Sequence, residues 1–228
     1  MSTGRDAPGM ANLGASATSV VLRAAGITKT YRYGVWPRRH SRHVLLGVDL
    51  SLRGGEVVGL VGENGSGKST LMRILVGDLA AEAGDVDVAG HLGYCPQVPI
   101  VYPRLTCNEH FDLFGHGYAM TEVDQRAARD RLYDELGFAR YAGVRADELS
   151  GGTLAKLNLT LALLPTPKVL LLDEPYAGFD FDTYLRFWDL VGRLRAAGCA
   201  VLLISHFVAD TERFDRILDL IDGRARPR

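Results

Sequence analysis

The sequence predicts an α/β fold with a parallel sheet at its centre. Residues 169–172 (VLLL), within KVLLLDEP, form a continuous apolar run, which is typical of a strand buried on both faces. A helical pattern, FDTYLRFWDLVGRLRAAG, and a second apolar strand pattern, CAVLLIS, follow it in that order. A glycine-rich loop also joins a strand pattern (EVVGLV) to a helical pattern (STLMRILVGDL). Because strands and helices alternate, we expect parallel strands joined by crossover helices.

The composition indicates a globular domain with no overall attraction to polyanions. Apolar residues make up 47% of the 228 residues, and the formal net charge is −1. A net charge this close to zero creates no overall electrostatic attraction to nucleic acid or to an anionic membrane, so no nucleic-acid partner is expected. No apolar run reaches the ~18 residues that a membrane span needs, so any work at a membrane is expected to need another polypeptide. The three cysteines, Cys95, Cys107 and Cys199, form no CxxC pair and are expected to be buried thiols in a reducing compartment.

The N-terminal part predicts a flexible tail and then a sheet. Residues 1–19 are rich in Gly, Ala, Ser and Thr, and they lack the charged leader and apolar run of a signal peptide. Residues 20–33 and 43–62 show β-branched alternation broken by Gly pairs, which predicts strands. Between them lies the basic segment 34–43 (GVWPRRHSRH), which we expect to be a solvated loop without an assigned function.

The middle third predicts helices. Thr106 and Glu109 have the spacing of a capping box before a helical pattern. Thr121 opens a second, amphipathic helix that Gly137 closes. We therefore expect one domain at residues 20–228, in which a helical subdomain is inserted into a core. The predicted boundaries are 97–152 for the helical subdomain, and 20–96 with 153–228 for the core.

The glycine-rich loop GENGSGKST (residues 62–70) matches the phosphate-binding pattern G-x-x-x-x-G-K-[ST] between a strand and a helix, which is the context that this motif requires. Glycines let the backbone wrap round phosphates so that N–H groups point inward, and Lys68 adds positive charge at the β and γ phosphates. The hydroxyl of Ser69 can bind Mg²⁺. The predicted nucleotide-binding residues are Gly62, Glu63, Asn64, Gly65, Ser66, Gly67, Lys68, Ser69 and Thr70.

Two adjacent carboxylates follow the buried strand at residues 168–172. Asp173 emerges at the carboxyl end of that strand, where ligands of open α/β sheets bind, and its carboxylate can hold Mg²⁺. Glu174 comes next and can orient and deprotonate an attacking water. We therefore predict that Asp173 is a metal ligand and that Glu174 is the catalytic base.

With GENGSGKST, LSGGT, LLLDEP, AGFD and LLISH in that order, the chain resembles the ATP-binding subunit of ABC transporters over residues 20–224. The resemblance implies a P-loop (RecA-like) parallel core, an N-terminal antiparallel β subdomain and an inserted helical subdomain. It implies that Tyr31 stacks on adenine, that Gln97 senses Mg²⁺ and water, and that His206 contacts the γ phosphate. Asp180, in AGFD, is implied as a nucleotide-site residue. The expected ligands are therefore ATP and Mg²⁺.

LSGGT (residues 149–153) raises the question of a second phosphate site. Ser150, Gly151 and Gly152 stand at a predicted helix N-terminus, whose unpaired N–H groups favour an anion. Because the chain's own phosphate loop already surrounds its nucleotide, we expect LSGGT to bind the ATP of a second copy or of a homologous subunit in a head-to-tail dimer. Thr153 replaces the Gln that is frequent in the family, and Phe179 replaces a usual Leu. Both changes preserve the local chemistry.

These inferences predict an ATP-hydrolysing subunit that drives a separate membrane-spanning permease from the cytoplasmic face, with export favoured over import. The resemblance assigns the permease contact to the helical insertion, where Tyr102, Phe111 and Phe114 are either contact residues or insertion core. One alternative is a soluble ABC-type ATPase that acts on ribosomes or DNA, for which tandem cassettes or a coiled-coil insertion are expected. Another is a P-loop GTPase or small-molecule kinase, which leaves LSGGT unexplained.

Overall fold

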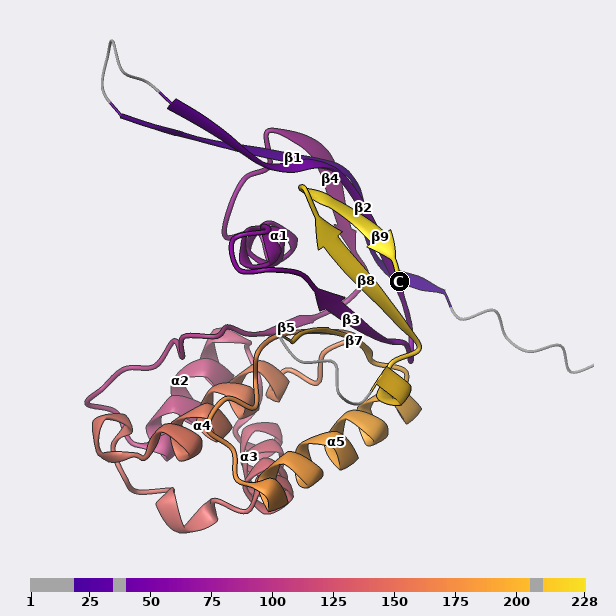
Figure 1. Ribbon diagram of the computed structural model, residues 1–228. Helices are drawn as coiled ribbons and strands as arrows, with labels where there is room; N and C mark the ends of the chain where they lie inside the picture. The colour runs from indigo at the N-terminus through magenta and orange to yellow at the C-terminus, as the bar shows by residue number, and fades with distance from the viewer. Residues whose placement is uncertain (1–18, 35–39, 206–210) are drawn as a thin grey trace, which may run out of the picture.

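The structure is a computed structural model that describes residues 19–34, 40–205 and 211–228 (Figure 1). Its strands are β1 (Val20–Tyr33), β2 (His40–Arg53), β3 (Val57–Val61), β4 (Ala83–Val88), β5 (Leu92–Cys95), β6 (Val169–Asp173), β7 (Ala200–Ile204), β8 (Arg216–Ile221) and β9 (Arg224–Pro227). Among the described residues they form a small antiparallel sheet, ordered β2-β1-β4, and a larger sheet, ordered β5-β6-β7-β3-β8-β9. The larger sheet is parallel from β5 to β8, and only β9 is antiparallel.

Helices cover both faces of the larger sheet. They are α1 (Lys68–Leu75), α2 (Cys107–Gly117), α3 (Glu122–Leu136), α4 (Gly151–Leu163) and α5 (Phe181–Ala196), with short 3-10 turns η1 (Ala139–Tyr141), η2 (Ala146–Glu148) and η3 (Thr211–Arg213). In Figure 1, α1 lies between the two sheets, whereas α2, α3, α4 and α5 lie on the opposite side of the larger sheet. The predicted α/β class with an antiparallel sheet and a helical insertion is therefore confirmed.

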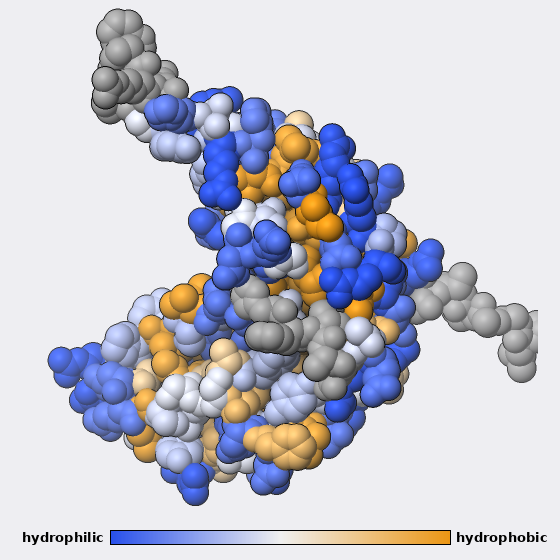
Figure 2. Space-filling model, in the orientation of Figure 1, coloured by the Kyte–Doolittle hydropathy of each residue, from blue (hydrophilic) through white to orange (hydrophobic). Residues whose placement is uncertain are grey.

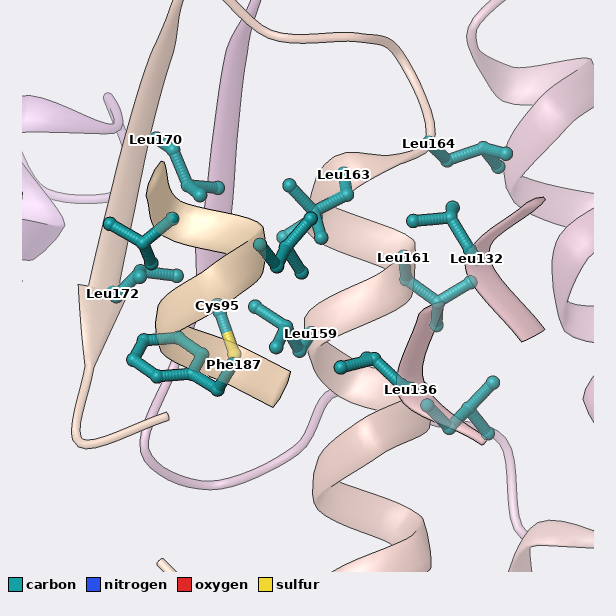
Figure 3. Close-up of a cluster of buried hydrophobic side chains, with 14 of the residues drawn as sticks. Cys95, Leu132, Leu136, Leu159, Leu161, Leu163, Leu164, Leu170, Leu172 and Phe187 are labelled. Atoms are coloured by element: carbon teal, nitrogen blue, oxygen red, sulfur yellow. The ribbon is translucent and has the colours of Figure 1, made fainter. Parts of the chain in front are cut away.

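Two apolar cores sit on the two faces of the larger sheet. Successive side chains of a strand point to opposite faces of the sheet. Because both faces are covered, every residue of β3, β6 and β7 is buried, as the continuous apolar runs predict. In β6, Leu171 packs in the core that includes α1 and the small sheet, whereas Leu170 and Leu172 belong to the core that includes α4 and α5. Figure 3 shows Leu170, Leu172 and Phe187 beside the leucines of α4. Burial on both faces fixes the carboxyl end of β6, where Asp173 stands.

The helical insertion begins and ends as its caps predict. The Thr106 side chain accepts from the Glu109 N–H while the Glu109 carboxylate accepts from the Thr106 N–H, which completes the capping box of α2. Thr121 caps α3, and Gly137 ends it in the left-handed conformation with φ 64°. The exact domain boundaries and the flexibility of residues 1–19 stay predictions, because residues 1–18 lie outside the described part of the chain.

Of the two alternatives for Phe111, permease contact or insertion core, the structure supports the core. The Phe111 side chain is 1% exposed and lies edge-on to Tyr133, with ring centroids 5.1 Å apart. Phe114 is partly buried against the same core, whereas Tyr102 is 54% exposed. Phe111 therefore packs toward α3, whereas Tyr102 is still a candidate for the permease contact.

The basic segment 34–43 is not wholly a loop. Its residues from His40 onward are the start of β2, and His40 pairs with Tyr33 across the β1–β2 hairpin. Cross-strand pairing with β1 extends the sheet into a segment whose local composition favours a loop. Residues 35–39 lie outside the described residues.

The three cysteines are buried free thiols, as predicted. Burial raises the pKa of Cys107 to about 11 and the pKa of Cys199 to about 11. Cys95 is fully buried, and desolvation raises its pKa further. These groups therefore stay protonated at neutral pH and behave as small apolar side chains.

Candidate nucleotide site

The phosphate loop connects β3 to α1 and leaves the start of α1 open. The N-cap of α1 is Gly67, at φ 109°, and no side chain of the described residues caps the helix. A Cβ at this position would lie 2.9 Å from Val44 Cγ1 and 3.1 Å from the Val44 carbonyl oxygen, so only glycine fits. The N–H groups of the first turn of α1 therefore have no competing cap, which suits an anion.

Lys68 is held inside this loop. It is 6% exposed, and its Nζ donates to the carbonyl oxygens of Gly62 at 2.7 Å and Glu63 at 3.0 Å. Burial lowers the pKa of the Lys68 ammonium, and the nearby charges of Glu174 and Asp173 act in the opposite direction. A partly desolvated cation surrounded by loop backbone is a strong site for phosphate oxygens.

The loop borders a cleft that brings together part of the predicted site. An open cavity of about 610 Å³ is lined by residues of β1, β2, the phosphate loop, the end of β5 and the end of β6. Tyr31 lies at its edge, 37% exposed, with Oη 3.5 Å from Thr70 Oγ1. The lining residues are Tyr31, Tyr33, Arg42, Val44, Asn64, Gly65, Gly67, Lys68, Ser69, Thr70, Gln97 and Glu174. A second cavity of about 1010 Å³ also borders the loop and is lined in part by Gly62, Glu63 and Ser66.

Ser66, a half-buried residue of the loop, has an unsatisfied hydroxyl. Its Oγ is buried, and it has no hydrogen-bond partner among the described residues. A buried hydroxyl without a partner costs about 1–3 kcal/mol, so it calls for a partner that the chain itself does not supply. This observation fits a bound phosphate group.

The carboxylates stand at the carboxyl end of β6, as predicted. Asp173 is 3% exposed at the last position of the strand. Glu174 has φ 52°, and its N–H donates to the Ile204 carbonyl oxygen at 3.2 Å. A non-glycine residue in this conformation costs about 1–3 kcal/mol and is held there by its surroundings. The turn directs the chain away from the strand, and Glu174 lines the cleft.

Arg42 is a cleft residue that sequence reasoning missed. It pairs with Tyr31 across the β1–β2 hairpin, and its Nη2 donates to the Gly65 carbonyl oxygen at 2.9 Å. The guanidinium therefore braces the outer turn of the phosphate loop and adds positive charge at its rim. The basic segment 34–43 contained the sequence signal for this residue, because its residues from His40 onward belong to β2, the strand that pairs with Tyr31.

LSGGT lies at a separate place, beside AGFD. Ser150 is exposed and caps α4, since its Oγ accepts from the Thr153 N–H at 3.3 Å. The Thr153 N–H, in the first turn of this helix, is therefore paired within the chain. A Cβ on Gly152 would lie 2.6 Å from the Gly178 carbonyl oxygen, so the two motifs are in contact.

Asp180 also has a structural role. It is the N-cap of α5, with Oδ1 accepting from the Thr183 N–H at 2.8 Å. Hydrogen bonds from Thr183 lower the pKa of Asp180. Neither Asp180 nor the LSGGT residues are among those that line the cleft of their own chain.

Comparison with known proteins identifies the family. Residues 45–177 match the family model described as ABC transporter. The chain belongs to the ABC transporter family. It is 34% identical over 189 residues to the ABC-type organic anion transporter ABCA8B of Mus musculus, covering 78% of this chain and 12% of the relative. It is 31% identical over 222 residues to the Nod factor export ATP-binding protein I of Mesorhizobium japonicum, covering 92% of this chain and 63% of the relative.

Solved ABC cassettes have the same fold. The dimeric structure of MJ0796, a bacterial ABC transporter cassette, superposes with a TM-score of 0.82 at 25% identity and covers 91% of this chain and 97% of that chain. A dimeric post-hydrolysis state of MJ0796 bound to ADP and Pi has the same TM-score and identity. The family and fold predicted from the sequence are thus confirmed, and the chain is an ABC transporter ATP-binding cassette.

The ABC cassette brings part of the predicted site together. Tyr31, Lys68, Ser69, Gln97 and Glu174 share one cleft. Asp173 is buried at the neighbouring strand end, and His206 lies outside the described residues. Among the described helices, none combines the length and apolar character that would let it cross a membrane.

Proposed function

We propose that this ABC cassette binds MgATP in the cleft between the phosphate loop and β1. Two features of the cleft support this proposal, the uncapped start of α1 and the buried ammonium of Lys68. The unpartnered Oγ of Ser66, in the same phosphate loop, supports it further. Tyr31, at the cleft edge, would stack on the adenine ring. Ser69, Gln97 and Asp173 supply the oxygen atoms that Mg²⁺ prefers, and the ion, when bound, would neutralise phosphate charge.

We propose that the chain hydrolyses ATP to ADP and phosphate. Glu174 lines the same cleft as Lys68, and its carboxylate is proposed to orient and deprotonate a water. His206 is proposed to contact the γ phosphate. Asp173, buried one residue earlier, is proposed to act on the metal rather than on the water.

The second phosphate-binding motif is proposed to serve a second copy of the chain or a homologous subunit. The carrying observation is that Ser150 and Gly151 are exposed and absent from the cleft of their own chain. In a head-to-tail pair, the phosphate loop of one copy and LSGGT of the other would enclose one nucleotide, and the arrangement would occur twice. Asp180 would lie at the same interface, since Gly152 contacts Gly178. ATP would then favour dimerisation by mass action.

The dimer is proposed to drive a membrane-spanning permease from the cytoplasmic face. Apolar side chains reach the surface of the helical half of the molecule (Figure 2). Val98 is 77% exposed, Ile100 62% and Tyr102 54%, and all three follow Gln97 in the chain. This short apolar segment suits contact with another protein. Similarity to a Nod factor export ATP-binding protein supports export as the direction.

Mixing two inactive variants tests the shared site. Lys68→Ala removes the phosphate-loop cation, and Ser150→Asp puts a negative charge at the start of α4. Each variant alone is expected to lack ATPase activity. A heterodimer of the two contains one intact composite site and one doubly damaged site, so activity should return on mixing. If the mixture stays as inactive as its components while the unmodified chain hydrolyses ATP, the proposed sharing of sites is wrong.

A further inference from the structure

Two buried polar side chains hold the chain segment that carries Gln97. The segment leaves the larger sheet at the end of β5 and reaches α2 at Cys107. Asn158 of α4 is 6% exposed, and its Nδ2 donates to the Pro96 carbonyl oxygen at 2.8 Å and to Cys95 Sγ at 3.2 Å. The residue immediately before Gln97 is therefore tied to the middle of α4.

His110 of α2 holds the other end. Its side chain is fully buried, and the Tyr102 backbone N–H donates to Nε2 at 2.8 Å. The Nδ1 atom lies 2.8 Å from the Thr106 carbonyl oxygen. Because a backbone N–H only donates, Nε2 must accept and Nδ1 must carry the proton, which assigns one neutral tautomer. Both ring nitrogens are thus used to hold backbone atoms of this segment.

Between these two attachments the segment is exposed on one side and faces the nucleotide cleft on the other. Gln97 lines the cleft. Val98 and Ile100 are 77% and 62% exposed. Because the segment is held at both ends, few of its residues can change conformation independently. A partner that displaced Val98 and Ile100 would therefore also displace Gln97. In a longer loop without these attachments, the other loop residues would take up the displacement.

We propose that Asn158 and His110 are positioning residues that set the place of Gln97 in the nucleotide cleft. This inference rests on the proposed ATPase function. In this proposal, helix α4 has two roles. Its N-cap is Ser150, which is proposed to face the second copy, and Asn158 in its middle holds Pro96, the residue before Gln97. A shift of α4 on dimerisation would therefore also move Gln97 in its own cleft.

Isosteric and conservative substitutions test the proposal. Asn158→Leu removes the donor to the Pro96 carbonyl oxygen, and His110→Leu removes the acceptor of the Tyr102 N–H. Each should lower kcat for ATP on the order of 10-fold to 100-fold, since a misplacement of about 1 Å can cost 10²-fold. KM for ATP should change much less, because the phosphate loop is untouched. His110→Gln keeps an acceptor near the Nε2 position and should recover most of the activity.

Thr160→Val is the matched control for α4. Thr160 is fully buried on the same helix, but its Oγ1 donates only to the Leu157 carbonyl oxygen of that helix at 2.7 Å. This variant should keep kcat near the unmodified value. In a Gln97→Ala background, Asn158→Leu should cause no further loss of kcat. An equal loss with and without Gln97 would mean that Asn158 acts on general stability, and would overturn the proposal.

Amide exchange separates this inference from the ATPase proposal. The Tyr102 amide should exchange at least about 10-fold faster in His110→Leu than in the unmodified chain or in Thr160→Val, because it loses its acceptor. Unchanged exchange would refute the attachment whether or not the chain hydrolyses ATP. If exchange rises as expected but the unmodified chain with Mg²⁺ hydrolyses no ATP, the ATPase proposal fails, and with it the role assigned to Gln97.

Discussion

Ser150→Asp distinguishes a helix cap from a binding site for the second copy's nucleotide. In the structure Ser150 Oγ accepts from the Thr153 N–H at 3.3 Å. Asp is as good an N-cap as Ser, so the carboxylate can accept the same N–H, and the stability of the monomer should change by about 0.3 kcal/mol or less. The substitution adds a negative charge at an exposed helix start, where a phosphate is proposed to bind. Its effect should therefore appear in ATP-dependent dimerisation, and in the ATPase activity that depends on it, but not in the stability of the monomer.

The size of that effect follows from the added charge. Two like charges 4 Å apart repel by about 1 kcal/mol in water and by about 4 kcal/mol at an effective dielectric constant of 20. A symmetrical pair contains this contact twice, so ATP-dependent dimerisation should weaken by about 2–8 kcal/mol. The smaller figure already corresponds to roughly 30-fold in Kd.

Sedimentation velocity with MgATP, in a Glu174→Gln background to retain the nucleotide, measures this change. Ser150→Ala is the control. It loses the cap, which should cost about 1 kcal/mol and lower Tm by about 2–4 °C, yet it adds no charge. The dimer of Ser150→Ala should therefore be much less affected than that of Ser150→Asp. If Ser150→Asp pairs with ATP as well as the unmodified chain, the N-terminus of α4 does not bind the partner's nucleotide.

Three further substitutions test other parts of the site. Tyr31→Ala should weaken ATP binding by about 1–3 kcal/mol relative to Tyr31→Phe or Tyr31→Trp, and equal calorimetric affinities would exclude stacking. Gly152→Ala places a Cβ 2.6 Å from a backbone carbonyl oxygen and should destabilise the monomer by about 1–3 kcal/mol. A Cβ at Gly151 has no described atom within 4 Å, so Gly151→Ala should not lower Tm, and equal Tm losses in the two variants would contradict the contact. Arg42→Gln should weaken ATP binding by about 1–2 kcal/mol. Arg32→Gln, which loses only an ion pair on an exposed strand, should not, and equal weakening would remove Arg42 from the site.

The contiguous motifs were predictable because their function depends on local backbone geometry. A strand, a glycine-rich turn and a helix start determine where Lys68 and Ser69 lie. The continuous apolar run of β6 likewise predicts that Asp173 ends a buried strand. Capping residues such as Thr106 act within one helical turn, so their role can also be predicted from the sequence.

Features that depend on packing between distant segments were not predictable in the same way. Arg42 reaches Gly65 only because β2 pairs with β1 beyond the apolar part of the strand. The orientation of Phe111 depends on the position of α3, which periodicity alone does not give. The hydrogen bond from Asn158 to the Pro96 carbonyl oxygen joins residues that lie far apart in the chain and match no motif.

Hydrolysis by Glu174→Gln is the most direct measurement of the central claim, which is that this cleft cleaves ATP with Glu174 as the base. The substitution keeps the size of the side chain and removes its ability to take a proton. MgATP binding should be retained, and the chain should accumulate as an ATP-bound dimer. The steady-state rate should fall by roughly 10²-fold to 10⁴-fold, which is the usual contribution of a general base. A rate close to that of the unmodified chain, measured with ATP bound at saturation, would contradict the account.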